Sequence, residues 1–209
     1  MIGSVVSFRS WRTTALVAAW FAASAGVWAW TVAYGTTTAQ PTHLALADPA
    51  PIVDGIGITR PTLYLFMHPR CPCTRATVTQ LQRVLASSGL DRSELPEVSV
   101  VATIPVGVAE DDDTWRQSET LRQAADLPNA TVHYDEGGVR AQSFGAQASG
   151  SVALYAADGR LLFAGGVTVS RGHDGESLGA EQLRKQIQNP KEGAPVTAPA
   201  LGCRLCRED

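Results

Sequence analysis

The longest stretch without a charged side chain places the strongest constraint on this sequence of 209 residues. No Asp, Glu, Lys or Arg stands between Arg12 and Asp48. Within that gap, Ala15–Tyr34 contains only three residues that are not apolar, namely Ser24, Gly26 and Thr31. A helix of about 20 residues is about 30 Å long, which matches the hydrocarbon core of a bilayer. The sequence therefore predicts one transmembrane helix over residues 13–35.

The residues that flank this span predict its orientation. Arg9 and Arg12 precede it, and no Lys or Arg follows it until Arg60. Because basic residues favour the cytoplasmic side, we expect residues 1–12 in the cytoplasm and the rest exported. A cleaved signal peptide is the alternative, with a small-residue site at Ala22–Ala25. The apolar run continues well past that site, which favours an uncleaved anchor.

Composition excludes several classes of protein for the chain as a whole. With 44% hydrophobic and 18% charged residues, it is neither disordered throughout nor a multi-span membrane protein. A net charge of −3 gives no global attraction to nucleic acid or anionic lipid. Residues 36–60 are rich in Thr, Ala, Pro and Gly, so we expect a flexible linker, with a weak strand near Pro51–Ile58.

Residues 61–190 alternate strand and helix patterns. The expected strands are Thr62–Met67, Glu97–Ile104, Ala130–Asp135, Val152–Ala156 and Arg160–Phe163. The expected helices are Cys73–Ser88, Thr114–Asp126 and Leu178–Gln188, with one or two helical turns at Val139–Phe144. This order predicts an α/β domain with a central sheet covered by helices on both faces, and Asp158-Gly159 marks an antiparallel hairpin that makes the sheet mixed. Residues 191–209 are expected to form an irregular tail that contains Cys203 and Cys206.

Two cysteines stand where the first strand of this domain gives way to its first helix. Pro72 suits the first helical turn, which places Cys71 near the helix N-cap beside free backbone N–H groups. The helix dipole and the guanidinium groups of Arg70 and Arg75 stabilise a thiolate there. Thiolates are the nucleophiles of thiol–disulfide exchange. Cys71 is therefore the expected attacking thiolate and Cys73 the resolving thiol.

This strand, followed by a Cys-Pro-Cys sequence that opens a helix, resembles the thioredoxin superfamily over residues 62–189. Val132–Asp135, Gly138–Gly145 and the hairpin at Ser151–Phe163 are similar to its membrane-anchored TlpA/ResA branch, and the HPRCPCTRA block (residues 68–76) is similar to RedB proteins. The resemblance implies a thioredoxin-like three-layer α/β/α sandwich behind one N-terminal transmembrane helix. It also implies a single-pass protein of the bacterial inner membrane whose domain faces the periplasm and exchanges disulfides with another exported protein.

The chain departs from that superfamily at two places. The family motif has two residues between its cysteines and this chain has one, so a Cys71–Cys73 disulfide closes a smaller ring that contains Pro72. We expect that ring to be strained and the site to be a weaker reductant. Relatives place a cis-proline opposite the cysteines, and the corresponding position here is Gly150. Its absence puts the family's route of substrate docking in doubt and leaves room for a ligand or a metal.

Other functions remain open at these residues. A thiol–disulfide oxidoreductase needs no cofactor. The alternative is a copper- or zinc-binding or metal-delivery protein that uses Cys71, Cys73 and either His68 or His173. His68 alternatively tunes Cys71 or only ends the strand. A catalytically idle scaffold is a third hypothesis.

The second cysteine pair, Cys203 and Cys206, lies in the expected tail. A flexible tail of this length reaches on the order of 20 Å, which would let the pair exchange electrons with Cys71 and Cys73. A terminal disulfide or an intermolecular link is the alternative. Exchange with the first pair predicts that a Cys73→Ser variant accumulates a disulfide between Cys71 and Cys203 or Cys206.

Overall fold

The computed structural model describes residues 3–36, 47–51, 59–108, 113–191 and 193–205. The chain divides into two compact units after Thr37. The first unit is a single helix, α1 (Gly3–Thr36). Its segment Trp11–Thr36 has a mean hydropathy of 1.5 and is long and apolar enough to cross a membrane. None of that segment is buried against protein, and large side chains such as Trp20, Phe21 and Trp28 are exposed. The expected weak strand at 51–58 lies largely outside the described residues.

The second unit is built on a mixed six-stranded sheet with the order β3-β2-β1-β4-β5-β6. Strands β1 (Thr62–Met67), β2 (Glu97–Ile104) and β3 (Ala130–Glu136) are parallel. Strand β4 (Ser151–Tyr155) runs antiparallel to β1 and forms the expected hairpin with β5 (Leu161–Gly165). The fold is thioredoxin-like: a parallel β-α-β unit joined to an antiparallel hairpin and a final helix.

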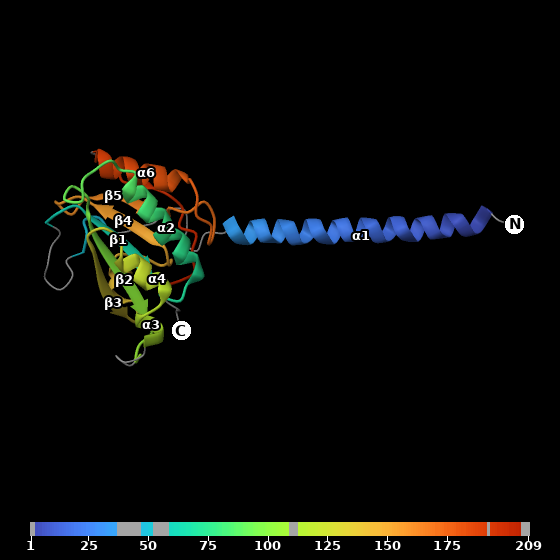
Figure 1. Cartoon of the computed structure of the whole chain (residues 1–209), viewed down its shortest axis with the longest axis horizontal. Coiled ribbons are helices and arrows are strands. Elements are labelled where there is room, and N and C mark those ends of the chain that lie inside the picture. Colours follow the sequence, from blue (N-terminus) through green and yellow to red (C-terminus); the bar gives the residue numbers. More distant parts are fainter. Residues whose placement is uncertain (1–2, 37–46, 52–58, 109–112, 192, 206–209) are drawn as a thin grey trace. The chain divides into compact units, whose positions relative to one another are not determined.

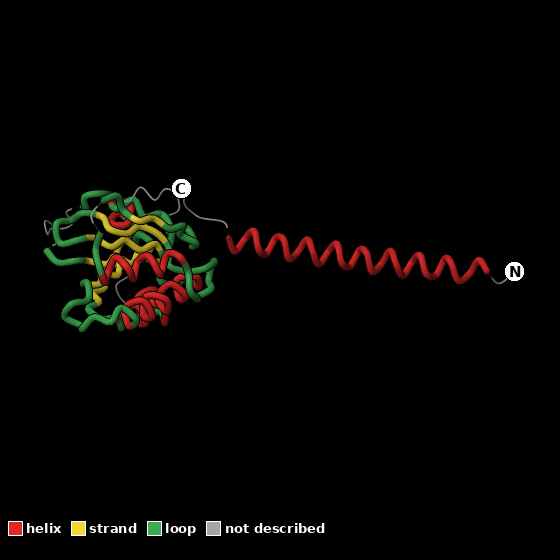
Figure 2. Tube along the Cα trace, turned by 90° about the horizontal axis from the view of Figure 1, so that it is seen from above, coloured by secondary structure: helices red, strands yellow, loops and turns green. Residues whose placement is uncertain are grey.

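Side chains of β1 alternate between two cores. Leu63, Leu65 and Met67 pack with helices α2 (Pro72–Ala86), α4 (Glu119–Ala125) and α6 (Leu178–Gln188). Phe66 points to the other face, together with Ala141 of α5 (Val139–Ser143). Figure 2 shows the sheet between these layers, with more helices on one face than on the other. The sheet is therefore covered on both faces, as the sequence predicts.

One expected helix is divided in the structure. Residues 114–126 form α3 (Asp113–Arg116) and α4, separated at Ser118. Ser118 has an extended backbone, and its hydroxyl accepts a hydrogen bond from the Leu121 N–H at 3.2 Å. Such a cap satisfies one of the free N–H groups of a helix start, so the serine begins a new helix rather than continuing the old one.

The described part of the tail packs against the domain, which corrects the expectation of a loose segment with a wide reach. Strand β6 (Val196–Thr197) adds to the sheet edge parallel to β5. Beyond it, Ala200 and Leu205 are buried in the core on the α5 face, beside Phe66 and Tyr155. Two apolar anchors on either side of Cys203 therefore hold this part of the tail in place.

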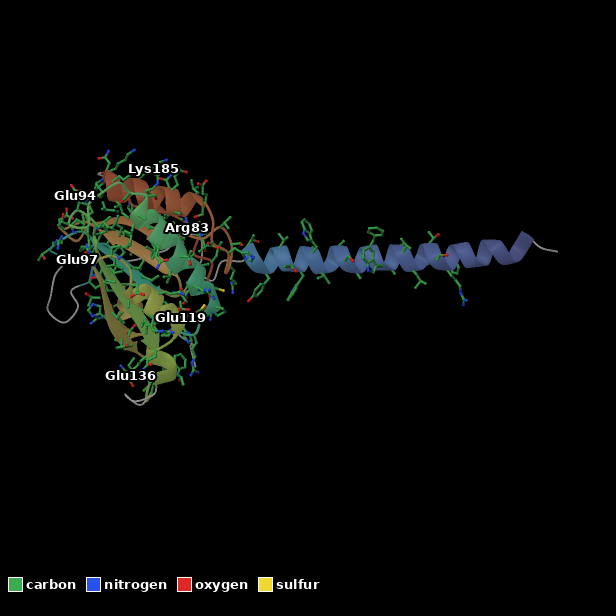
Figure 3. All side chains as sticks on the ribbon, viewed as in Figure 1. Arg83, Glu94, Glu97, Glu119, Glu136 and Lys185 are labelled. Atoms are coloured by element: carbon green, nitrogen blue, oxygen red, sulfur yellow. The ribbon has the colours of Figure 1, made fainter. Side chains whose placement is uncertain are left out.

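Charged side chains lie on the surface of the second unit. Arg83 of α2 and Lys185 of α6 are labelled in Figure 3. Arg83 pairs with Asp174 at 2.6 Å and Lys185 pairs with Glu181 at 2.5 Å, and all four side chains are substantially exposed. Exposed pairs of this kind contribute little to stability. Their distribution contrasts with α1, where Arg12 is the only charged residue between Trp11 and Thr36.

Candidate functional site

The start of α2 positions the first two cysteines. Cys71 is the N-cap residue, with an extended backbone, and Pro72 occupies the first turn, as the sequence predicts. Cys71 is 4% exposed, whereas Cys73, in the first turn, is partly exposed. Both are free thiols.

A buried hydroxyl network lies beside Cys71. The Thr74 hydroxyl is hydrogen-bonded to the Cys71 sulfur and lies 2.6 Å from the Ser149 hydroxyl. The Ser149 oxygen also accepts the backbone N–H of His68 at 2.9 Å. With Thr74 donating to sulfur, Ser149 donates to Thr74, so the chain of donors ends on Cys71. Hydrogen bonds of this kind stabilise a thiolate.

A third sulfur completes the group. Cys203 comes from the tail, 130 residues after Cys73, and the Sγ atoms of Cys71, Cys73 and Cys203 all lie within 4.8 Å of one another. The backbone holds it there: the Ser149 N–H donates to the Cys203 carbonyl at 2.7 Å, and the Leu205 N–H donates to the Gln147 carbonyl at 2.8 Å. An antiparallel bridge joins Ala148 to Arg204. The tail thus pairs with the loop that precedes β4. Cys206 lies outside the described residues.

The environment separates the three thiols by acidity. Burial raises the pKa of Cys71, but hydrogen bonds from the Thr74 hydroxyl, the Cys203 thiol and backbone N–H groups outweigh it, and the pKa is lowered. Burial and the neighbouring Cys71 charge raise the pKa of Cys73. Burial and the hydrogen bond to Cys71 raise the pKa of Cys203 to about 12. Cys71 is therefore the most acidic thiol of the group, and Cys203 is a thiol that donates a hydrogen bond to it.

Gly150 shows why this loop differs from the family pattern. Its φ is +89°, a conformation closed to proline, and its N–H donates to the Phe66 carbonyl at 2.8 Å. A Cβ at this position would lie 2.7 Å from the Thr77 hydroxyl oxygen. The loop therefore packs directly onto α2 and is fixed by a bond that a proline cannot make.

His68 and Arg70 form a second feature beside the thiols. The His68 Nδ1 accepts the Arg70 N–H at 3.2 Å, and the Arg70 guanidinium lies 4.2 Å from the centre of the Trp115 ring. The His68 ring contacts the edge of the same Trp115. Burial, and to a smaller extent the Arg70 charge, lower the pKa of His68. The His68 ring is thus held in the turn before Cys71 by contacts with Arg70 and Trp115.

The loop after β5 borders the cysteine group on another side. A Cβ on Gly172 would lie 3.8 Å from the Cys73 sulfur, and the Arg171 charge favours the Cys73 thiolate. His173 Nδ1 contacts the Arg171 carbonyl at 3.0 Å. Among the described residues, the group of converging metal-ligand atoms contains the three sulfurs and neither His68 nor His173. The structure thus brings Cys203 to the predicted pair, where the sequence analysis had weighed histidines as additional ligands.

Comparisons with known proteins support the fold. No protein-family model matches the chain, and no curated protein matches it significantly. Among solved structures, an uncharacterized conserved protein from Geobacillus kaustophilus is 13% identical, with a TM-score of 0.53 over 83% of this chain and 95% of the other. A hypothetical protein from Sinorhizobium meliloti is 18% identical, with a TM-score of 0.46 over 84% and 98%.

A secreted disulfide oxidoreductase of Mycobacterium tuberculosis, described as homologous to E. coli DsbE, is also similar. It is 18% identical, with a TM-score of 0.40 over 62% of this chain and 81% of that one. At these identities the comparisons bear on the fold alone, and only the first has a score high enough to carry weight. The chemistry of the site has to be argued from its own residues.

Proposed function

We propose that the protein is a membrane-anchored thiol–disulfide oxidoreductase with Cys71 as its nucleophile. The observation that carries the proposal is the placement of the Cys71 sulfur at the start of a 15-residue helix, with hydrogen-bond donors directed at it and two further thiols within 4.8 Å. A lowered pKa gives a larger thiolate fraction near neutral pH, and a second thiol within reach allows a mixed disulfide to be resolved.

The reaction runs in two exchange steps. The Cys71 thiolate attacks one sulfur of a substrate disulfide, forms a mixed disulfide and releases the other substrate sulfur as a thiolate. The thiolate of Cys73 or Cys203 then attacks the Cys71 sulfur and releases the second substrate sulfur. The substrate gains two electrons and the proton released by the resolving thiol, while this chain is left with one disulfide. The reverse sequence oxidises a dithiol substrate.

Two thiols compete for the second step. A Cys71–Cys73 disulfide closes a small ring that contains Pro72, and we expect that ring to be strained. A Cys71–Cys203 disulfide joins residues far apart in the sequence and has no such ring. We therefore expect Cys203 to resolve whenever Cys73 is removed, and to share the role in the unaltered protein.

The anchor belongs to the same proposal. α1 exposes a continuous apolar surface from Trp11 to Thr36, and contact of such a surface with water is unfavourable. Insertion into a bilayer removes that contact. With Arg9 and Arg12 on the cytoplasmic side, the domain faces the periplasm of a bacterial inner membrane, where its substrates are exported proteins that carry disulfides or dithiols.

The test is a redox titration of the full chain in detergent micelles. The protein is equilibrated in graded glutathione buffers and alkylated at acid pH, and each cysteine is assigned by mass spectrometry. Trypsin cleaves at Arg204, so Cys203 and Cys206 fall in different peptides. We expect a reversible transition of Cys71 at one defined potential. If Cys71 stays a free thiol across the whole range, the proposal fails and the scaffold hypothesis gains.

Single substitutions assign the roles. Cys71→Ser should abolish reduction of a disulfide-bonded model protein, whereas Cys206→Ser should leave it unchanged. Cys73→Ser should accumulate a Cys71–Cys203 disulfide on mild oxidation. If that variant forms disulfides with partner proteins and none between Cys71 and Cys203, Cys203 is not a resolving thiol.

A further inference from the structure

We propose that Cys71, Cys73 and Cys203 form a three-sulfur binding site for a single copper(I) ion. The inference goes beyond the proposed function, because it concerns the reduced thiols as ligands rather than their exchange reaction. It starts from the convergence of three sulfur atoms within 4.8 Å of one another. A metal ion about 2.3 Å from each of three coplanar sulfurs requires the sulfurs to lie about 4 Å apart, which is within that limit.

Three different anchors position these sulfurs. The extended N-cap geometry of α2 sets Cys71, the first helical turn sets Cys73, and the bridge between Ala148 and Arg204 sets Cys203. The tail backbone lies directly against the loop at this point, since a Cβ on Gly202 would lie 1.8 Å from the Ser149 carbonyl oxygen. A site whose ligands are already in place needs little reorganisation to accept an ion.

The ligand set selects the metal by its softness and its number. Thiolates favour copper(I) and zinc among the common biological ions. Zinc in structural sites almost always takes four ligands, whereas no described carboxylate or imidazole joins the three sulfurs in this group. Copper(I) is satisfied by three sulfurs in a plane. The three sulfurs of the described residues therefore fit copper(I), and zinc, which needs a fourth ligand, is the competing outcome of the experiment.

Charge and burial around the site agree with an anionic sulfur cluster. Three thiolates with one copper(I) carry a net charge of −2. The positive end of the α2 dipole and the Arg171 charge, which acts on Cys73, both oppose that charge. Cys71 is buried, whereas Cys73, with Gly172 against its sulfur, and Cys203 are partly exposed. Binding displaces the thiol protons and changes no oxidation state, so it requires no other reactant.

The experiment is a competition titration of the fully reduced full chain in detergent micelles under anaerobic conditions. Copper(I) is supplied with a chromophoric copper(I) chelator, and X-ray absorption at the copper edge reports the ligands. We expect one copper(I) per chain with three sulfur neighbours. Two sulfur neighbours, or preferential binding of zinc(II) with copper(I) left on the chelator, would overturn the proposal.

Matched substitutions in the tail isolate the third ligand. Cys203→Ser should weaken copper(I) binding by at least about 10-fold, because loss of a ligand costs no less than loss of a partner that only orients a ligand, which costs about 10–100-fold. Cys206→Ser, the same change three residues later, should leave the affinity unchanged. Equal losses in both variants would contradict the assignment of Cys203. Thermal unfolding of the metal-free variants shows whether either change has instead disturbed the fold.

The redox and metal proposals fail separately. A protein whose Cys71 titrates reversibly with glutathione but binds no copper(I) refutes only the metal site. A protein that binds copper(I) through three sulfurs but never forms a Cys71 disulfide refutes only the oxidoreductase.

Discussion

The beginning of α2 and the tail from Ala198 to Leu205 deliver cysteines to one point by different means. Cys71 and Cys73 follow a buried strand and begin a helix whose side chains fill the larger core. Cys203 is held mainly by backbone hydrogen bonds to the loop 147–149 and by two buried apolar anchors, Ala200 and Leu205. The α2 thiols are thus tied to the stability of the whole domain, whereas the tail thiol depends on a local contact.

That difference matters for chemistry at the site. Segments with few anchors open at a lower free-energy cost than the core does. When the tail is docked, Cys203 donates to Cys71 and the third sulfur is in place. Without the docked tail, Cys71 would keep only the hydrogen bonds from its own helix. The two regions can therefore be separated by substitutions that affect only one of them.

The largest effect is expected from Gly202→Ala. The added methyl group would lie 1.8 Å from the Ser149 carbonyl oxygen, so the tail must move away from the loop. Overpacking of this severity costs about 3 kcal/mol. If opening of the tail limits access to the thiol, alkylation of Cys203 should accelerate by about 100-fold. Site-resolved mass spectrometry of a timed alkylation measures this rate.

Gly193→Ala is the control in the same tail. A Cβ there meets no atom within 4 Å, although its φ of +121° makes the substitution locally strained. The rate for Cys203 should change by less than about 10-fold, because the strain lies before β6. Equal acceleration in both variants would show that the tail opens as one piece, without a specific hold at Gly202.

A smaller effect is expected from Thr74→Val, which acts on the α2 side. The substitution removes the hydroxyl that donates to the Cys71 sulfur. A hydrogen bond to a charged group contributes about 1.5–3 kcal/mol, so the lowered pKa of Cys71 should rise by about one to two units. The pH at which Cys71 reaches half of its maximal alkylation rate should therefore move upward by that amount.

Thr79→Val controls for the change in residue type. Thr79 lies in the same helix and donates to the Arg75 carbonyl at 3.1 Å. It is not among the groups that act on the Cys71 thiol. Its pH profile should match that of the unaltered protein. An unchanged profile in Thr74→Val as well would mean that the Cys203 thiol and the backbone N–H groups alone set the acidity of Cys71.

Sequence reasoning succeeded where structure is set by local patterns. The bounds expected for Thr62–Met67, Glu97–Ile104 and Leu178–Gln188 agree with β1, β2 and α6, because apolar runs and helix periodicity report burial directly. Pro72 likewise marked the first turn of α2. These signals lie within a few residues of the structure they predict.

The docking of Cys203 could not be predicted in the same way. It depends on backbone groups of residues 147–149 and 203–205, which carry no preference for particular side chains. The sequence held only an indirect sign, the glycines Gly165 and Gly202, each of which leaves room for the backbone of another segment. Because these backbone contacts leave no pattern in the sequence, the expectation of a wide-ranging tail was wrong. The hypothesis that Cys203 exchanges electrons with Cys71 and Cys73 now has a geometric basis that can be tested.

The smallest effect is expected from Arg171→Gln, which separates charge from hydrogen bonding. The Arg171 charge acts on Cys73 and opposes the burial that raises its pKa, so its removal should raise the pKa of Cys73 further. A partly screened charge of this kind contributes up to about 1 kcal/mol, which is less than about one pKa unit. The pH profile of Cys73 alkylation should move upward by that amount and that of Cys71 should stay in place. Equal movement of both profiles would mean that Arg171 acts on both α2 thiols and not on Cys73 alone.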